Sequence, residues 1–322
     1  MTARGVTEQR QASALEPPQW VFDLVPGALG AWEESGPELR VRAAETGGFK
    51  VVEVRVPGAL ELEAARFEAA CAAAYGEIFR RLQETPACHP VRMWNFIPRI
   101  LDPLGEERHR YMHFNFGRYA AFSDAFGTGD AFQRAIPTAS GVGHDASELK
   151  IVSLSATAPG VAVENPRQIA SYCYSERWGM LPPCFARATR IAGPEGEPLL
   201  LVGGTASVCG EESVHQGDLD LQARETFLNL AVLIHAAEGR PAGPQPTQQA
   251  AADLLRRYRR LRVYYVHGHH RAAVQELVRR HFPADTEAEL LQAELCRPEL
   301  LIEIEGFARL EPLETRSATE RP

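Results

Sequence analysis

Two glutamates stand two residues apart near the end of the chain, Glu303 and Glu305 in the segment LLIEIEG. Alternate side chains of a strand share a face, so both would lie opposite Ile302 and Ile304. The ordinary interpretation of such a pair is a face in contact with water. If one glutamate is buried in a cleft instead, the loss of water raises its pKa and lets it act as a general acid near neutral pH. That shift costs roughly 3 to 4 kcal/mol, which is feasible for one buried carboxylic acid but not for two adjacent ones.

Two arginines stand alone among apolar and aromatic residues, Arg118 in FGRYAAF and Arg187 in PPCFARA. A surface arginine usually has polar neighbours, so these two are candidates for binding a carboxylate, each such contact being worth about 1.5 to 3 kcal/mol. The alternative is that each side chain packs along its apolar stem and turns its charged end to water.

Arginine supplies nearly all of the positive charge. The 322 residues include 34 Lys+Arg against 42 Asp+Glu, a net charge of −8, and the only lysines are Lys50 and Lys150. A guanidinium group can bind a carboxylate through two parallel hydrogen bonds, which suits a small anionic ligand. The excess of acidic residues argues against a nucleic-acid partner, because proteins that bind the phosphate backbone gather basic residues on one face.

The sequence gives no indication of export, membrane insertion or metal binding. The N-terminal segment has no apolar stretch of the kind found in secretory signals. The longest apolar candidate for a membrane span, 227–237, is about half the length that a bilayer requires. The six cysteines form no CxxC pair, and the histidines of VHGHH have no further ligand at metal-binding spacing. We therefore expect a cytoplasmic protein with reduced cysteines and with neither metal nor cofactor.

The elements that must position these groups are clearest in the second half of the chain. The segments 185–191 and 199–209 are predicted strands joined by a turn at 193–198. A helix follows, with Asp218 as its N-cap and Gly239 as its stop. The remaining elements are a helix after the linker 240–246, a strand at 262–266, a helix at 271–282, a strand near 290–295 and a last strand within 298–310. This order predicts helices stacked on one face of a mixed sheet.

The first half is less regular. Residues 59–83 have the apolar spacing of an amphipathic helix. The aromatic-rich stretch that begins at Met93 fits a pocket wall and an aromatic core equally well. The chain length suits two tandem domains of the α/β (α+β) class, an N-terminal one over 1–160 and a C-terminal one over 161–312, followed by a disordered tail at 313–322.

Six segments, taken in order, resemble the chorismatase family of chorismate-cleaving enzymes. They are MWNFIPRI (93–100), FNFGRYAAF (114–122), TASGVG (138–143), VENPRQIASYCY (163–174), PPCFARAT (182–189) and GGTASVCGEESVHQGD (203–218). The C-terminal part is also similar to the RidA (YjgF) family, through LQARETFLNLAVLIHAAEG and AELCRPELLIEIEGFARL. The resemblance implies a RidA/YjgF-like (chorismate mutase-like) fold, with most of the active site in the C-terminal domain.

The resemblance also implies a role for each candidate residue. Chorismate carries two carboxylates and a vinyl ether. Arg118 and Arg187 would hold the carboxylates, while Glu303 would protonate the methylene carbon of the ether and then face the resulting cation. The candidates for hydrogen bonds to substrate oxygens are Tyr172, Tyr174 and Thr205. No cofactor is implied, chorismate is the expected partner, and the chain is expected to be a monomer or a small homo-oligomer.

The expected product depends on two further positions. A cysteine seven residues before the catalytic glutamate, here Cys296, and a glycine in the TASxxG stretch, here Gly210, resemble the branch that forms 3-hydroxybenzoate. Trp178, Met180 and Cys209 depart from that pattern, so 4-hydroxybenzoate and the dihydroxycyclohexadiene carboxylate stay open as products. The alternatives of another kind are a RidA-like imine hydrolase and a binding protein for small aromatic acids.

Overall fold

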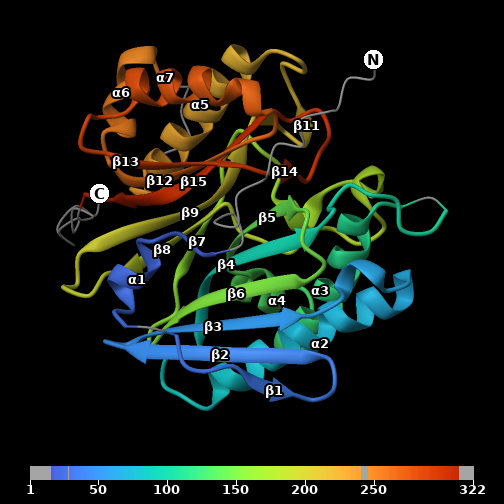
Figure 1. Ribbon diagram of the computed structural model, residues 1–322. Coiled ribbons are helices and arrows are strands. Elements are labelled where there is room, and N and C mark those ends of the chain that lie inside the picture. Colours follow the sequence, from blue (N-terminus) through green and yellow to red (C-terminus); the bar gives the residue numbers. More distant parts are fainter. Residues whose placement is uncertain (1–15, 28, 107, 241–245, 312–322) are drawn as a thin grey trace.

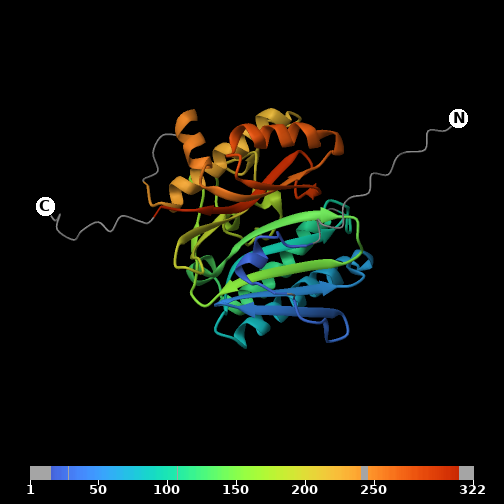
Figure 2. The same cartoon turned by 60° about the vertical axis from the view of Figure 1, so that its left-hand side comes forward.

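The computed structural model describes residues 16–27, 29–106, 108–240 and 246–311, and the tail predicted at 313–322 lies outside them. Two β-sheets lie face to face, and helices cover the outer side of each sheet (Figures 1 and 2). Three hydrophobic cores follow from this arrangement, one under each helical layer and one between the sheets.

The first sheet has seven strands in the order β1-β2-β3-β6-β4-β5-β14. Neighbouring strands run antiparallel except β4 and β5, which are parallel. The strands are β1 (Glu33–Ser35), β2 (Leu39–Thr46), β3 (Phe49–Val56), β4 (His89–Pro98), β5 (Thr138–His144), β6 (Leu149–Ala156) and β14 (Glu294–Leu295). All but β14 come from the first half of the chain.

The outer side of the first sheet is covered by α2 (Ala64–Gln83), α3 (Arg110–Phe126) and α4 (Asp130–Ala135). The predicted helix over 59–83 begins five residues late, because 59–61 form the short turn η2 (Ala59–Glu61) after Gly58, whose φ is 68°. The helices α2 and α3 lie very close to each other at Gly117, where a Cβ atom would be 2.3 Å from the carbonyl oxygen of Glu68. Only glycine permits that approach.

The second sheet has six strands in the order β13-β12-β15-β9-β8-β7. They are β7 (Val161–Val163), β8 (Ala188–Ala192), β9 (Pro198–Ala206), β12 (Tyr258–Tyr265), β13 (Glu287–Gln292) and β15 (Ile302–Arg309). Its outer side is covered by α5 (Leu219–Ala237), α6 (Gln248–Leu255) and α7 (Arg271–His281). The predicted N-cap of α5 is confirmed, since the Asp218 side chain accepts a hydrogen bond of 3.0 Å from the backbone N–H of Leu221.

Short elements connect these layers. They are α1 (Val21–Leu24), η3 (Ser171–Cys173), η4 (Glu176–Trp178), η5 (Gly268–His270) and the hairpin of β10 (Val208–Cys209) and β11 (Glu212–Ser213). The segment 164–187, which carries η3 and η4, connects β7 to β8 and forms part of a pocket wall.

The layer between the two sheets is rich in aromatic side chains. Trp20 lies 5.7 Å from Trp94 of β4, ring centre to ring centre, and 5.7 Å from Phe307 of β15. These contacts join the N-terminal segment to both sheets. The inner face of β15 is therefore covered by protein and not by water.

The predicted fold class is confirmed, with mixed sheets and helices on one face of each. The strand expected near 290–295 divides into two, because the chain leaves the second sheet at Ala293 and pairs with β5 of the first as β14. The first sheet's last consecutive strand ends at Ala156 and the second sheet begins at Val161. The division into domains of 1–160 and 161–312 stays a prediction.

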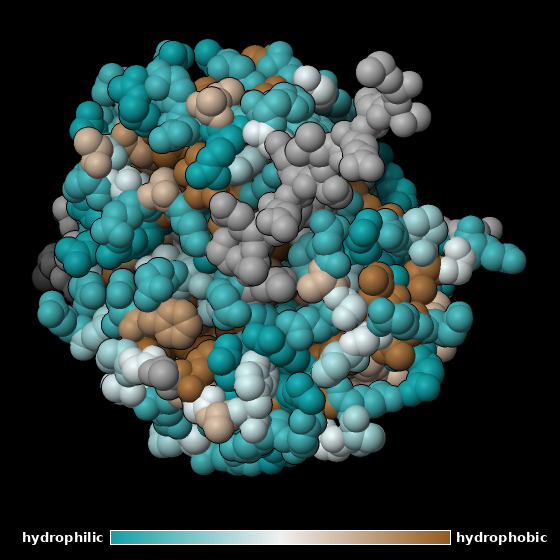
Figure 3. Space-filling view, viewed as in Figure 1, coloured by the Kyte–Doolittle hydropathy of each residue, from teal (hydrophilic) through white to brown (hydrophobic). Residues whose placement is uncertain are grey.

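The surface seen in Figure 3 is mostly hydrophilic, and its apolar atoms gather in small separate patches. Among the described residues, no helix is both long enough and apolar enough to cross a bilayer. The cytoplasmic location and the oligomeric state stay predictions.

Candidate active site

A pocket of about 100 Å³ lies at the end of the layer between the sheets, where β15 begins. Four parts of the chain form its wall: the start of α3, the segment before β8, the end of β9 and the turn before β15. The lining residues include Tyr111, Tyr174, Trp178, Phe185, Arg187, Gly204, Cys296, Arg297 and Glu303. They bring one carboxyl group, two guanidinium groups and several aromatic rings together.

Glu303 is buried at the start of β15, with 4% of its surface exposed. Burial and the negative charge of Glu305 together raise its pKa to about 8, although nearby arginines oppose both effects. The solvated face expected for this strand is wrong, because the first sheet covers it. Gly204 of β9 lies against the carboxyl group so closely that a Cβ there would be 2.1 Å from Oε1 of Glu303.

Glu305 is also fully buried, but its carboxylate accepts hydrogen bonds from four donors. Three are the Arg92 guanidinium at 2.6 Å, the Trp94 indole N–H at 2.9 Å and the Tyr264 hydroxyl at 3.2 Å. The fourth is the hydroxyl of Ser140. Both glutamates are thus buried, and Glu305 is stabilised as a carboxylate by an arginine and three further donors.

Arg187 precedes β8 and lines the pocket with 7% of its surface exposed. Its Nη2 donates to the carbonyl oxygen of Ile169 at 3.0 Å and to the hydroxyl of Tyr174 at 2.5 Å. The guanidinium lies 5.1 Å from the ring centre of Phe185. The predicted pair of Arg187 and Tyr174 thus meets at the pocket.

Arg118 is buried in α3 and does not belong to the pocket lining. Its Nη2 donates to Asn115 at 2.7 Å, and its guanidinium lies 5.9 Å from the ring centre of Phe185. The same ring therefore contacts Arg118 as well as Arg187. Arg118 thus contacts a residue of the pocket wall without lining the pocket itself.

Arg297 is a pocket arginine that the sequence analysis missed. It is 7% exposed, its guanidinium lies 3.5 Å from the ring centre of Trp178, and Nη1 donates to the carbonyl oxygen of Glu211 at 2.8 Å. Two glutamates flank Arg297 in the stretch ELCRPELL, so the criterion of an arginine alone among apolar residues does not select it.

Besides Arg118, three of the predicted substrate-binding residues lie away from the pocket lining. Tyr172 packs against the core beneath the first sheet. Thr205 pairs with Ile304, and the two side chains lie on the same face of the sheet. That face is the α5 side, because Ile304 belongs to the core there. The hydroxyl of Thr205 donates to the carbonyl oxygen of Gly203 at 3.0 Å. Gly210, at φ 61°, forms the turn between β10 and β11. Its role is conformational, because that backbone region favours glycine.

Cys296 lines the pocket as predicted, directly after β14. Burial above all, together with the nearby Glu303, raises the pKa of its thiol to about 12. The thiol is therefore neutral near pH 7 and can donate a weak hydrogen bond, but it is a poor nucleophile.

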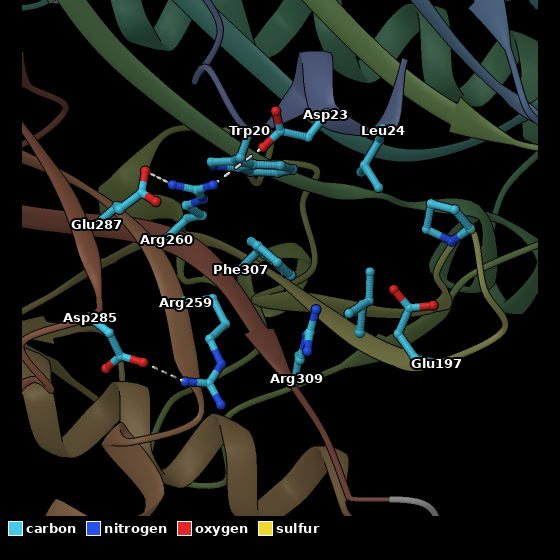
Figure 4. A pocket seen from close by; sticks show the side chains of 12 residues that line it. Trp20, Asp23, Leu24, Glu197, Arg259, Arg260, Asp285, Glu287, Phe307 and Arg309 are labelled. Carbon is cyan, nitrogen blue, oxygen red and sulfur yellow. Dashed lines mark hydrogen bonds and ion pairs between the residues drawn. The ribbon is translucent and has the colours of Figure 1, made fainter. Parts of the chain in front are cut away.

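A larger pocket of about 560 Å³ lies elsewhere, beside Trp20 (Figure 4). Its charged groups largely satisfy one another, since Arg259 lies 3.4 Å from Asp285 and Arg260 lies 3.6 Å from Asp23. Among the described residues, no group of three or more His, Cys, Asp or Glu side chains is arranged to hold a metal ion. The smaller pocket, lined by a buried glutamate whose pKa is raised and by two arginines, is the candidate active site.

Comparison with known proteins identifies related sequences and a related structure. Residues 30–155 match the family model for the N-terminal part of chorismatases of the FkbO/Hyg5-like type. A 3-hydroxybenzoate synthase of Streptomyces hygroscopicus is 33% identical over 89% of this chain and 79% of its own. A chorismatase of Streptomyces rapamycinicus is 30% identical over 85% of this chain and 78% of its own. The crystal structure of a chorismatase aligns with a TM-score of 0.72 at 25% identity, covering 87% of this chain and 80% of that one.

These matches identify the protein as an enzyme, which sets aside the alternative of a pure binding protein. The chain belongs to the chorismatase family.

Proposed function

We propose that the enzyme cleaves the enolpyruvyl ether of chorismate and releases pyruvate and 3-hydroxybenzoate. The observation that carries the proposal is Glu303, a carboxyl group with a pKa of about 8 in a pocket lined by Arg187 and Arg297. An acid protonated at neutral pH is what a vinyl ether needs, because the slow step is proton transfer to carbon.

The reaction begins with transfer of the Glu303 proton to the methylene carbon of the vinyl ether. This step places a positive charge on the ether carbon and leaves Glu303 as a carboxylate, which stabilises the cation. The pocket is small and largely apolar, so this electrostatic interaction is stronger than it would be in water. Pyruvate and 3-hydroxybenzoate together contain the atoms of chorismate, so no water is consumed overall.

Arg187 and Arg297 are our candidates for the two substrate carboxylates. Both line the pocket, both are more than nine-tenths buried, and each is held by hydrogen bonds to backbone carbonyl oxygens. Fixed guanidinium groups bind carboxylates without losing side-chain freedom on binding. This assignment replaces Arg118, predicted from the sequence, with Arg297.

Support for 3-hydroxybenzoate as the product comes from Cys296, which lines the pocket beside Glu303, and from the relative named a 3-hydroxybenzoate synthase. A neutral thiol at that position can hydrogen-bond a ring hydroxyl and exclude water from the cation. Were water to reach the cation, the product would be the dihydroxycyclohexadiene carboxylate.

The experiment is incubation of the purified enzyme with chorismate, without added metal, followed by measurement of pyruvate and chromatography of the acids formed. We expect equal amounts of pyruvate and 3-hydroxybenzoate, and almost no pyruvate from Glu303→Gln, whose amide cannot donate the proton to carbon. Intact chorismate, or full activity of Glu303→Gln, would contradict the proposal. An imine substrate of the RidA type, tested in parallel, should not be hydrolysed.

A further inference from the structure

The two glutamates on the inner face of β15 have opposite surroundings. Among the described residues, none hydrogen-bonds to the carboxyl group of Glu303, which faces the pocket. Glu305, two residues along, accepts from Arg92, Ser140, Trp94 and Tyr264. One carboxyl group is thus open to a substrate, and the other is fully occupied.

The donors around Glu305 favour its ionised form. The guanidinium of Arg92 and the indole of Trp94 can donate hydrogen bonds but cannot accept them. A proton on Glu305 would have to be donated to the hydroxyl of Ser140 or Tyr264, and it would remove the negative charge that pairs with the buried Arg92 guanidinium. A single proton shared between the two glutamates therefore belongs on Glu303.

We propose that Glu305 is a positioning residue of this enzyme, a fixed negative charge that keeps the proton on Glu303 until substrate takes it. The inference rests on the proposed function, because it assigns a cause to the acidity of the group that protonates chorismate. Glu305 does not touch the pocket and acts only through Glu303.

The charges facing Glu303 show why the anion matters. They come from β15 itself, from β4, from the residue before β8 and from the turn after β14. The other titratable groups nearby are two tyrosines, the histidine before α3 and the pocket thiol. These groups are Glu305, Arg92, Arg187, Arg297, Tyr111, Tyr174, His109 and Cys296. Burial keeps Tyr111 and Cys296 neutral near pH 7 by raising their pKa values, and it lowers the pKa of His109. Three arginines thus favour loss of the Glu303 proton, and Glu305 is the charge that most strongly favours its retention.

The test is the pH dependence of kcat for pyruvate release by the full chain, compared with that of Glu305→Gln. Alternate residues on one strand face lie about 7 Å apart, and at that distance one charge in a partly buried site shifts a neighbouring pKa by about 1 to 2 units. The alkaline limb of Glu305→Gln should therefore move to lower pH by that amount, while activity at low pH is largely retained. A loss of activity equal at every pH would mean a structural role only.

The matched control is Glu289→Gln. Glu289 also pairs with a buried arginine of the second sheet, at 2.8 Å from Nε of Arg262, but it lies on β13 and outside the pocket. Its removal should leave the pH profile of kcat unchanged. A shift as large as that of Glu305→Gln would overturn the assignment of a specific role to Glu305.

Infrared spectroscopy gives a second readout that requires neither turnover nor a folded Glu305 variant. At pH 7 the wild-type enzyme should absorb more strongly than Glu303→Gln in the region of buried protonated carboxyl groups, by the amount expected for one group; Glu164, whose pKa burial raises to about 7, contributes to both spectra. If the two spectra do not differ there, Glu303 does not carry the proton and the inference is wrong. If the wild-type enzyme releases no pyruvate, the proposed function fails, whereas the infrared result still decides which glutamate carries the proton.

Discussion

Gly204 offers a sharp test of the role of Glu303, because one added methyl group meets the catalytic carboxyl directly. In Gly204→Ala the new Cβ would lie 2.1 Å from Oε1 and 2.7 Å from Cδ of Glu303. Ordinary contact begins near 3.4 Å, so Oε1 must move by about 1.3 Å. The obstacle is the end of a flexible side chain, so the carboxyl group can move without unfolding the sheet.

A misplacement of about 1 Å in a reacting group can lower a rate by about a hundredfold, which corresponds to about 2.7 kcal/mol in the activation free energy. We expect that loss in kcat for pyruvate release. The melting temperature should fall by only a few degrees, because no backbone atom stands in the way of the methyl group. A large loss of activity with a small loss of stability is the result that identifies Glu303 as the affected group.

The matched control is Gly76→Ala in α2, where a Cβ would meet nothing within 4 Å. It should keep full activity and gain roughly 0.5 to 1 kcal/mol in stability from its helical position. In a Glu303→Gln background, Gly204→Ala should cause little further loss, because the group that it displaces is already inactive. Near wild-type kcat for Gly204→Ala would refute the placement of the Glu303 carboxyl group.

Three other predictions follow from the site. With a pKa of about 8 for Glu303, kcat/KM for chorismate should fall above that pH. Because the unfolded chain loses this proton from about pH 4.5 and the folded chain only from about pH 8, the free energy of unfolding should also decrease over that range, by at most about 5 kcal/mol. Glu303→Gln should abolish that part of the pH dependence in urea titrations, and an unaltered dependence would speak against the raised pKa. Cys296→Ala should shift the product from 3-hydroxybenzoate towards the dihydroxycyclohexadiene carboxylate, and an unchanged ratio by chromatography would remove Cys296 from the mechanism. Arg297→Ala should raise KM by about 10- to 100-fold through loss of one charge-assisted contact, whereas an unchanged KM would contradict carboxylate binding.

Single helices and hairpins could be predicted because the residues that define them lie close together in the sequence. The N-cap Asp218 and the apolar spacing behind it define α5, and the turn at 193–198 defines the β8-β9 hairpin. Glu303 was a candidate general acid on the condition that it is buried, and the structure meets that condition. The covering residues come from a sheet formed mostly by the first half of the chain, and strand alternation alone does not reveal them.

The predicted place of Thr205 and the unassigned role of Glu305 are errors with equally specific causes. Thr205 faces the helices because the pairing of β9 with β15 shifts register between Ile304 and Gly306. The pair Gly203 and Gly204 is a sequence signal for such an irregularity, but it does not say which neighbours change face. Glu305 could not be assigned, because Arg92, Trp94 and Ser140 lie more than 150 positions earlier in the sequence.

The two-residue strand β14 has a consequence for the order in which the protein can become active. Until Glu294 and Leu295 have been synthesised, Val142 and Gly143 of β5 lack their partners, and unpaired strand residues of this kind are a place where unfinished chains can associate wrongly. Cys296, Arg297 and Glu303 follow within eight residues of that pairing. The strand that completes the first sheet and the proposed catalytic acid are therefore synthesised almost together. A ribosome-bound chain that stops before β14 would contain the aromatic residues of the pocket wall but not Glu303.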